Sequence, residues 1–162
     1  MNRRSLIATV GAGVVGAVAG CSSNSEPEPE TIAVGGDVNT HLSRAEQRIE
    51  IGYNQTEKQE WSQCRTAFST AADEISAAET DVQTGLDQAQ NVGSAEQQEA
   101  LELLLESVRT LGNGVDELQE VCTEMDAGNA AVAERHAENA TEYMNEYDEM
   151  APEITQAFER LE

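Results

Sequence analysis

Three cysteines, two histidines and many closely spaced acids are the residues of this 162-residue chain that could do chemistry. A di-iron centre in a helical bundle needs Glu-x-x-His on two helices. Val38 and Ala133, however, stand three residues before His41 and His136. Zinc-protease, Cys-x-x-Cys, phosphate-loop, dinucleotide, EF-hand and nucleophile-elbow motifs are not found in the sequence either. We therefore predict no metal and no cofactor, and we interpret His136 as a structural residue and His41 as an exposed one.

Pairs of acids three residues apart are the remaining candidates for catalysis. Glu117/Glu120 and Glu146/Glu149 are examples. General acid–base catalysis requires one carboxyl of such a pair to be desolvated, so that its pKa rises. Acids on the solvated face of a helix offer no reason for that desolvation. We predict that these pairs are surface residues and that the chain is not an enzyme.

Cys21 closes an N-terminal stretch that is first basic and then apolar. Arg3 and Arg4 precede a run of apolar and small residues from Leu6 to Ala19. This run is shorter than the roughly 20 residues of a spanning helix. A basic start, a short apolar run and a small-residue exit are typical of an export signal, and the paired arginines favour the twin-arginine (Tat) route. We therefore predict a signal peptide over residues 1–20.

The sequence Val18-Ala19-Gly20-Cys21 resembles the lipobox of prokaryotic lipoproteins, in which the signal is removed before the cysteine and the thiol carries lipid. The resemblance implies a lipid anchor on Cys21 that holds the protein at the cell membrane, facing outside. Residues 21–36 are rich in Ser, Pro, Glu and Gly, a composition that predicts an extended, disordered linker. The alternative is a retained N-terminal helix with an ordinary buried cysteine.

The chain is strongly acidic, with 31 acids against 9 bases and a formal net charge of -22. This balance excludes nucleic acid as a partner, because its phosphates require a basic surface. Excess acid, a single lysine (Lys58) and few aromatic residues together resemble haloarchaeal proteins, whose surfaces stay hydrated in salt. A merely acidic bacterial lipoprotein is the alternative.

Two N-glycosylation sequons occur, Asn54-Gln-Thr56 and Asn139-Ala-Thr141. Exported haloarchaeal proteins can carry such glycans. Asn54 and Asn139 are therefore candidate glycosylation sites.

From Asp37 onward the apolar residues recur at helical spacing, which predicts an all-α antiparallel bundle of about four helices over residues 37–162. Ser94 and Gln97 have the spacing of a capping box after a break at Gly93, and a second turn is predicted at residues 126–129. The turn near Lys58 contains no glycine or proline, so a single helix over residues 40–91 is the alternative. The predicted buried stripes include Cys64, Phe68, Ile75, Val82 and Leu86 before Gly93, and Leu101, Leu104, Val108, Val115 and Cys122 after it.

A resemblance to a known helix hairpin favours a turn near Lys58. The pattern Gly52…Trp61…Cys64…Phe68…Ala71 is similar to the spacing in a tetratricopeptide helix hairpin. The stretch Gly128-Asn129…Ala133…Ala137…Ala140 repeats its second half. The 34-residue register between repeats is missing. The resemblance therefore implies helix-turn-helix geometry and not a peptide-binding repeat array.

Cys64 and Cys122 test the register of this bundle. Each lies 29 residues from Gly93, so an antiparallel hairpin that turns there brings them opposite each other. Thiols outside the cytoplasm are oxidised. We predict a Cys64–Cys122 disulfide, with two free buried cysteines as the alternative.

These features predict a non-catalytic, lipid-anchored extracytoplasmic protein that acts as an interaction or envelope scaffold module with an unknown protein partner. The alternative is a ligand- or cation-binding accessory lipoprotein, for example one that serves a transporter. That alternative predicts a concave pocket with converging polar groups.

Overall fold

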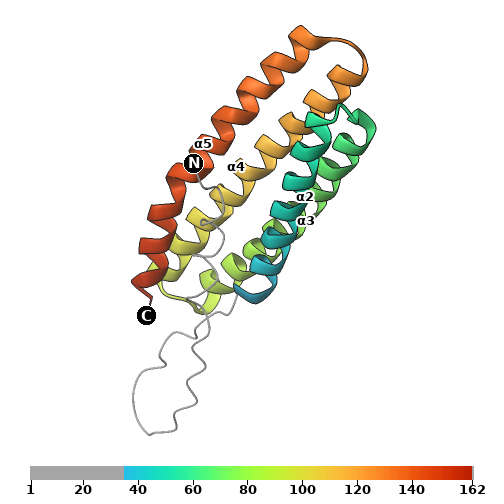
Figure 1. Ribbon diagram of the computed structural model, residues 1–162. Coiled ribbons are helices and arrows are strands. Elements are labelled where there is room, and N and C mark those ends of the chain that lie inside the picture. The colour runs from blue at the N-terminus through green and yellow to red at the C-terminus, as the bar shows by residue number, and fades with distance from the viewer. Residues whose placement is uncertain (1–34, 162) are drawn as a thin grey trace, which may run out of the picture.

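The computed structural model describes residues 35–161, which form four antiparallel helices (Figure 1). The helices are α2 (Gly35–Glu57), α3 (Trp61–Val92), α4 (Ala95–Asp126) and α5 (Ala130–Glu159). Connections this short turn the chain straight back, so successive helices become antiparallel neighbours. The prediction of an all-α antiparallel bundle of about four helices is confirmed. The predicted signal peptide, with Arg3 and Arg4, lies outside the described residues, as does Cys21.

The chain does turn between α2 and α3, without a glycine or proline. Gln59 adopts a φ of 60°, in the left-handed region. Its N–H donates to the carbonyl of Thr56, and the N–H of Glu60 donates to the carbonyl of Gln55. This pair of bonds is a Schellman motif. The end of α4 has the equivalent pair of bonds: Gly128, with a φ of 79°, donates its N–H to the carbonyl of Met125, and Asn129 donates to the carbonyl of Glu124. One continuous helix over 40–91 is therefore excluded.

The connection between α3 and α4 follows the predicted capping box. The N–H of Gln97 donates to the Ser94 hydroxyl at 3.1 Å, and the N–H of Ser94 donates to the Gln97 side-chain oxygen at 2.9 Å. Each bond satisfies a backbone donor that the helix itself leaves unpaired. This junction sets the register of the two longest helices.

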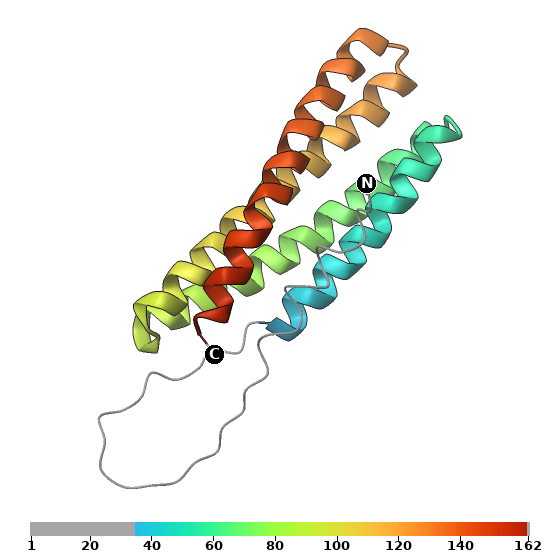
Figure 2. The same cartoon turned by 60° about the vertical axis from the view of Figure 1, so that its left-hand side comes forward.

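Helices α3 and α4 are the inner pair of the bundle, because α2 packs on α3 and α5 packs on α4. The ten stripe residues named above are buried, and Met125, at the end of the predicted second stripe, is half-buried. Met144, Tyr147, Met150 and Phe158 of α5 pack against the same core. Gly114 allows α5 to approach α4 closely, since a Cβ there would lie 3.0 Å from Cε of Met144. The hairpin α2–α3 and the hairpin α4–α5 diverge toward the ends that carry their connecting turns (Figure 2).

Candidate functional site

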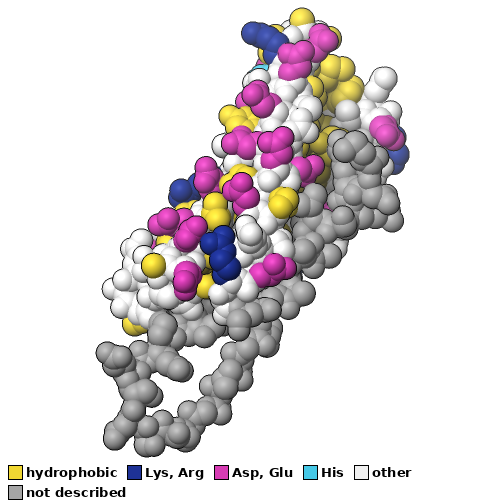
Figure 3. Space-filling view, turned by 90° about the vertical axis from the view of Figure 1, so that its left-hand side faces the viewer, with side chains coloured by type: hydrophobic (Ala, Val, Ile, Leu, Met, Phe, Trp, Pro, Cys, Tyr) yellow, Lys and Arg dark blue, Asp and Glu magenta, His cyan; other side chains and the backbone are white. Residues whose placement is uncertain are grey.

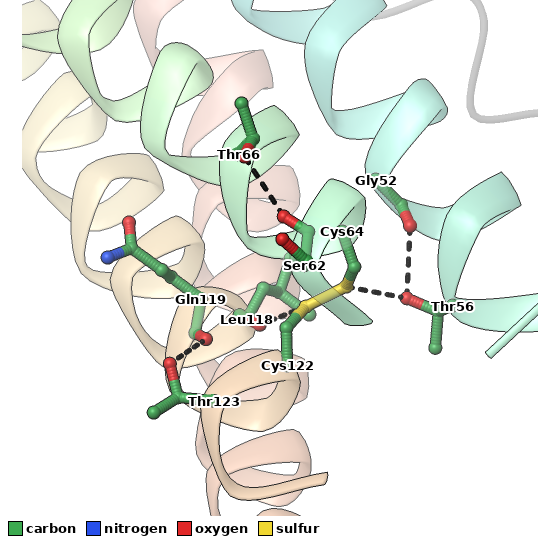
Figure 4. The surroundings of a disulfide bond; sticks show 9 residues. All are labelled: Gly52, Thr56, Ser62, Cys64, Thr66, Leu118, Gln119, Cys122 and Thr123. Carbon is green, nitrogen blue, oxygen red and sulfur yellow. Dashed lines mark hydrogen bonds between the residues drawn. A yellow bond between two sulfur atoms is a disulfide. The ribbon is translucent and has the colours of Figure 1, made fainter. Parts of the chain in front are cut away.

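The predicted disulfide is present and joins the two inner helices. Cys64 of α3 and Cys122 of α4 are bonded, with 6.0 Å between their Cα atoms, and both are fully buried (0% exposed). Thr56 reaches the bond from α2 (Figure 4). Its hydroxyl donates to the carbonyl of Gly52 at 3.0 Å, and its oxygen lies 3.2 Å from Sγ of Cys64. The cysteines are thus a cross-link near the diverging ends of the hairpins and not a reactive thiol site.

His41, which the sequence placed on the surface, is three-quarters buried, with 25% of its side chain exposed. Its Nδ1 lies 2.6 Å from Oε2 of Glu74, and its Nε2 lies 3.9 Å from Oδ2 of Asp81. Arg44 approaches the same Glu74 oxygen at 3.9 Å. His41 therefore connects the outer helix α2 to the inner helix α3.

His136 makes the corresponding contact on the other side of the bundle. Its Nδ1 lies 2.6 Å from Oε2 of Glu117, and Asn139 donates to the same oxygen at 3.3 Å. These two contacts to Glu117 connect the outer helix α5 to the inner helix α4. Both histidines hold outer helices in place, which agrees with the structural role predicted for His136. Neither glutamate could be assigned this role from the sequence, because their partners lie 33 and 19 residues away.

The two sequons lie within helices, where Asn54 of α2 and Asn139 of α5 are exposed. Their threonine hydroxyls are both occupied. Thr56 donates to Gly52 as described, and Thr141 donates to the carbonyl of Ala137 at 2.8 Å. Glycosylation of either asparagine stays a prediction.

A groove of about 390 Å³ lies between α3 and α4, and we call it the α3–α4 groove. Two of its lining residues, Ile75 and Val108, are apolar and buried, with only 3% and 0% of their surface exposed. The remaining lining residues are Ala72, Asp73, Ser76, Glu79, Arg109, Gly112, Asn113 and Asp116. Two effects raise the pKa of Asp116 above its usual value: partial burial, which is the larger, and repulsion from the negative charge of Glu117. Polar side chains from both inner helices thus line the α3–α4 groove.

Residues 35–161 contain neither a metal-binding cluster nor a membrane-spanning helix. No group of three or more histidine, cysteine, aspartate or glutamate side chains there is placed to hold a metal ion. None of those helices combines the length and apolar character needed to cross a bilayer. Comparison of the chain with protein-family models, with curated proteins and with solved structures finds no match.

Tyr147 gives the bundle a testable response to alkaline pH. Desolvation, together with the negative charges of Asp148 and Glu46, raises its pKa from 10.0 to about 12. The unfolded phenol therefore loses its proton first as the pH rises, while the folded phenol keeps it. Stability that is fully present below about pH 10 is lost between about pH 10 and 12, by roughly 2–3 kcal/mol from this residue. Urea unfolding across that pH range measures the loss.

The control for this experiment compares two phenylalanine variants. Tyr147→Phe cannot ionise at this position, so its stability should fall less steeply than that of the wild type between pH 10 and 12. Tyr143→Phe, four residues earlier on α5, is the matched variant that removes a tyrosine hydroxyl elsewhere on the same helix. Equal slopes in the wild type and Tyr147→Phe would contradict the expected shift.

Proposed function

We propose that this protein is a lipid-anchored, non-catalytic helical module on the outer face of the cell membrane, where it acts as an interaction or envelope scaffold. The observation that carries the proposal is the lipobox-like Val18-Ala19-Gly20-Cys21, which follows a basic and then apolar start. Cys21 lies 14 residues before the start of α2 at Gly35. At about 3.3–3.6 Å per residue, the intervening chain could hold the bundle up to roughly 50 Å from the membrane.

The distribution of charge supports a salt-rich habitat. Glu134, Glu138, Glu142 and Glu146 are exposed at successive four-residue intervals on α5. Like charges at this spacing destabilise a helix by about 0.2–0.5 kcal/mol per pair, and concentrated salt screens them. Acidic side chains are spread along the α5 face (Figure 3). A helix of this kind is best suited to a concentrated salt solution, in keeping with the haloarchaeal resemblance.

A ligand- or cation-binding accessory lipoprotein is the second candidate function. The α3–α4 groove favours it, because carboxylates from both helices line the groove. Such a protein would show thermal stabilisation by its ligand beyond the effect of salt alone.

Membrane fractionation of native cells, with mass spectrometry of the mature N-terminus, tests the first proposal. We expect the protein in the membrane fraction, cleaved before Cys21 and carrying lipid on its thiol. Cys21→Ser should lose the lipid and leave that fraction, whereas the matched variant Ser22→Ala should stay. Full-length protein with an unmodified N-terminus in the cytosol would overturn the proposal. Peptide mapping of the same sample reports glycans on Asn54 and Asn139.

A further inference from the structure

The two outer helices leave one side of the bundle open. α2 packs on α3 and α5 packs on α4, but within residues 35–161 α2 and α5 hardly contact each other. A closed four-helix bundle gives every helix two neighbours, whereas α2 and α5 have one each. The hairpins to which they belong also diverge toward their turns (Figure 2). The core between α2 and α5 therefore lacks the cover that a neighbouring helix gives elsewhere.

Partly buried apolar side chains form both edges of this opening. Glu46, Ile49 and Tyr53 are spaced three and four residues apart, so they share one face of α2. This face is directed toward α5, because the charge of Glu46 contributes to the raised pKa of Tyr147. Ile49, Tyr53 and Tyr147 contact the core but are only partly buried. With two further partly buried residues of α5, they form what we call the α2–α5 seam: Glu46, Ile49, Tyr53, Met144, Tyr147 and Met150.

The chain itself carries an apolar segment that can reach this seam. The run Leu6–Ala19, which lies outside the described residues, consists of apolar and small residues and carries no charge. Residues 20–34 connect it to the start of α2 at Gly35. These 15 residues span up to about 50 Å when extended, and α2, with 23 residues, is about 34 Å long. The connection is therefore long enough to bring the run to any part of the seam.

The charges that precede the run are complementary to those beside the seam. Arg3 and Arg4 are the only two adjacent bases in the chain. Glu50 of α2 and Glu142 and Glu146 of α5 are exposed next to seam residues. No ion pair within residues 35–161 reaches these three carboxylates. A basic pair joined to an uncharged run thus matches an apolar seam with acidic borders.

We propose that in the uncleaved chain the run Leu6–Ala19 docks along the α2–α5 seam and covers its apolar edges. Docking removes apolar surface of both the run and the seam from water, which is the dominant driving force for such association. It also places Arg3 and Arg4 beside the acids that border the seam. Removal of residues 1–20 then uncovers the seam, so this surface becomes available to a partner only after processing. Only this last step rests on the proposed signal peptide.

The reaction rate of a thiol within the run tests whether the run is covered. The uncleaved chain is used without detergent, in a Cys21→Ser background that cannot carry lipid. Val14→Cys then supplies the only free thiol, because Cys64 and Cys122 are bonded to each other. At about 1 M salt, where the Debye length is roughly 3 Å, we expect N-ethylmaleimide to react at least about tenfold more slowly than with the urea-unfolded chain. The rate should not depend on protein concentration, because the run and the seam belong to one molecule.

Matched variants locate the contact on the bundle. Ile49→Glu places a charge in the seam and should restore rapid reaction. Ile51→Glu adds the same charge to α2 at a residue that is 40% exposed and outside the seam, so the reaction should stay slow. Within the run, Val10→Glu should restore rapid reaction without altering the bundle, whereas Asn2→Glu, outside the run, should not.

A nitroxide attached to the same thiol should broaden the amide signals of Ile49, Tyr53 and Met144 more than those of Asp73 and Asn113 in the α3–α4 groove. Rapid reaction in the uncleaved chain, or equal rates in Val10→Glu and Asn2→Glu, would overturn the proposal. Protection that increases with protein concentration would show that the run associates between copies, and would also overturn it. Because every sample lacks the thiol of Cys21, none of these outcomes bears on lipid anchoring, which mass spectrometry of the native protein tests separately.

Discussion

Replacing both Cys64 and Cys122 with alanine is expected to lower the free energy of unfolding by about 4 kcal/mol. The bond closes a loop of 58 residues, and in the chain-entropy model a cross-link of that span removes about this much conformational freedom from the unfolded chain. The separation of 6.0 Å between the Cα atoms is normal for a disulfide. Urea unfolding at fixed salt is the appropriate measurement, because guanidinium chloride would itself screen the acidic surface.

Three comparisons make this result specific to the cross-link. Each single substitution should cost about as much as the double, since each breaks the same bond. Reduced wild-type protein keeps both sulfurs in the core, so its stability separates the loss of the cross-link from the loss of packing. Cys21→Ala, measured with the wild type in one nonionic detergent, should leave unfolding of the bundle unchanged. A loss below about 1 kcal/mol would contradict the expectation, because the loop model requires several times more.

The register of the inner helices could be predicted because several local signals agree. Ser94 and Gln97 fix the start of α4 through the capping box, and the buried stripes on both sides of Gly93 have the helical period. Once the turn is located, antiparallel geometry places Cys64 opposite Cys122 without further information. The position of the two cysteines opposite each other therefore followed from spacing, whereas the bond between them was predicted from the expected export; the structure contains the bond.

The turn between α2 and α3 was harder to predict, because no residue type in it marks a turn and the packing of the two helices contributes to it. Gln59 adopts a left-handed φ of 60° that glycine adopts more readily. The two Schellman hydrogen bonds and the packing of α2 on α3 offset the cost of this conformation. Residue type at position 59 gives no indication of either contribution.

The candidate site could be predicted least. Helical periodicity identifies which face is buried, but it does not say which residues at the edge of that face meet across two helices. Glu74 and Glu117 look like ordinary surface acids in the sequence, yet the carboxylate of each is within hydrogen-bond distance of a histidine ring nitrogen on another helix. The α3–α4 groove likewise depends on Gly112 meeting Ala72 and Ser76 across the pair.

Gly52→Ala is expected to destabilise the protein by about 1–3 kcal/mol, although alanine is the better helix former. A Cβ at Gly52 would lie 2.6 Å from Cε1 and Cζ of the Phe68 ring. That ring is 1% exposed and packs edge-to-face with Tyr53, with 5.7 Å between the ring centroids. The ring cannot move away without repacking the core. The overpacking cost therefore outweighs the gain in helix propensity, which is about 1 kcal/mol.

Removing the Phe68 ring should reverse the sign of the stability change that Gly52→Ala causes. Phe68→Ala alone should cost about 3–5 kcal/mol through the cavity that it leaves. In that background Gly52→Ala places its methyl group in vacated space and should stabilise by up to about 1 kcal/mol. Urea unfolding of the four proteins gives a coupling of roughly 2–4 kcal/mol between the two sites. Gly112→Ala, whose Cβ would meet nothing closer than 3.4 Å, is the matched control and should stabilise slightly in both backgrounds. An equal cost of Gly52→Ala with and without the ring would show that α2 and α3 separate to accept the methyl group, and that Gly52 does not set their distance.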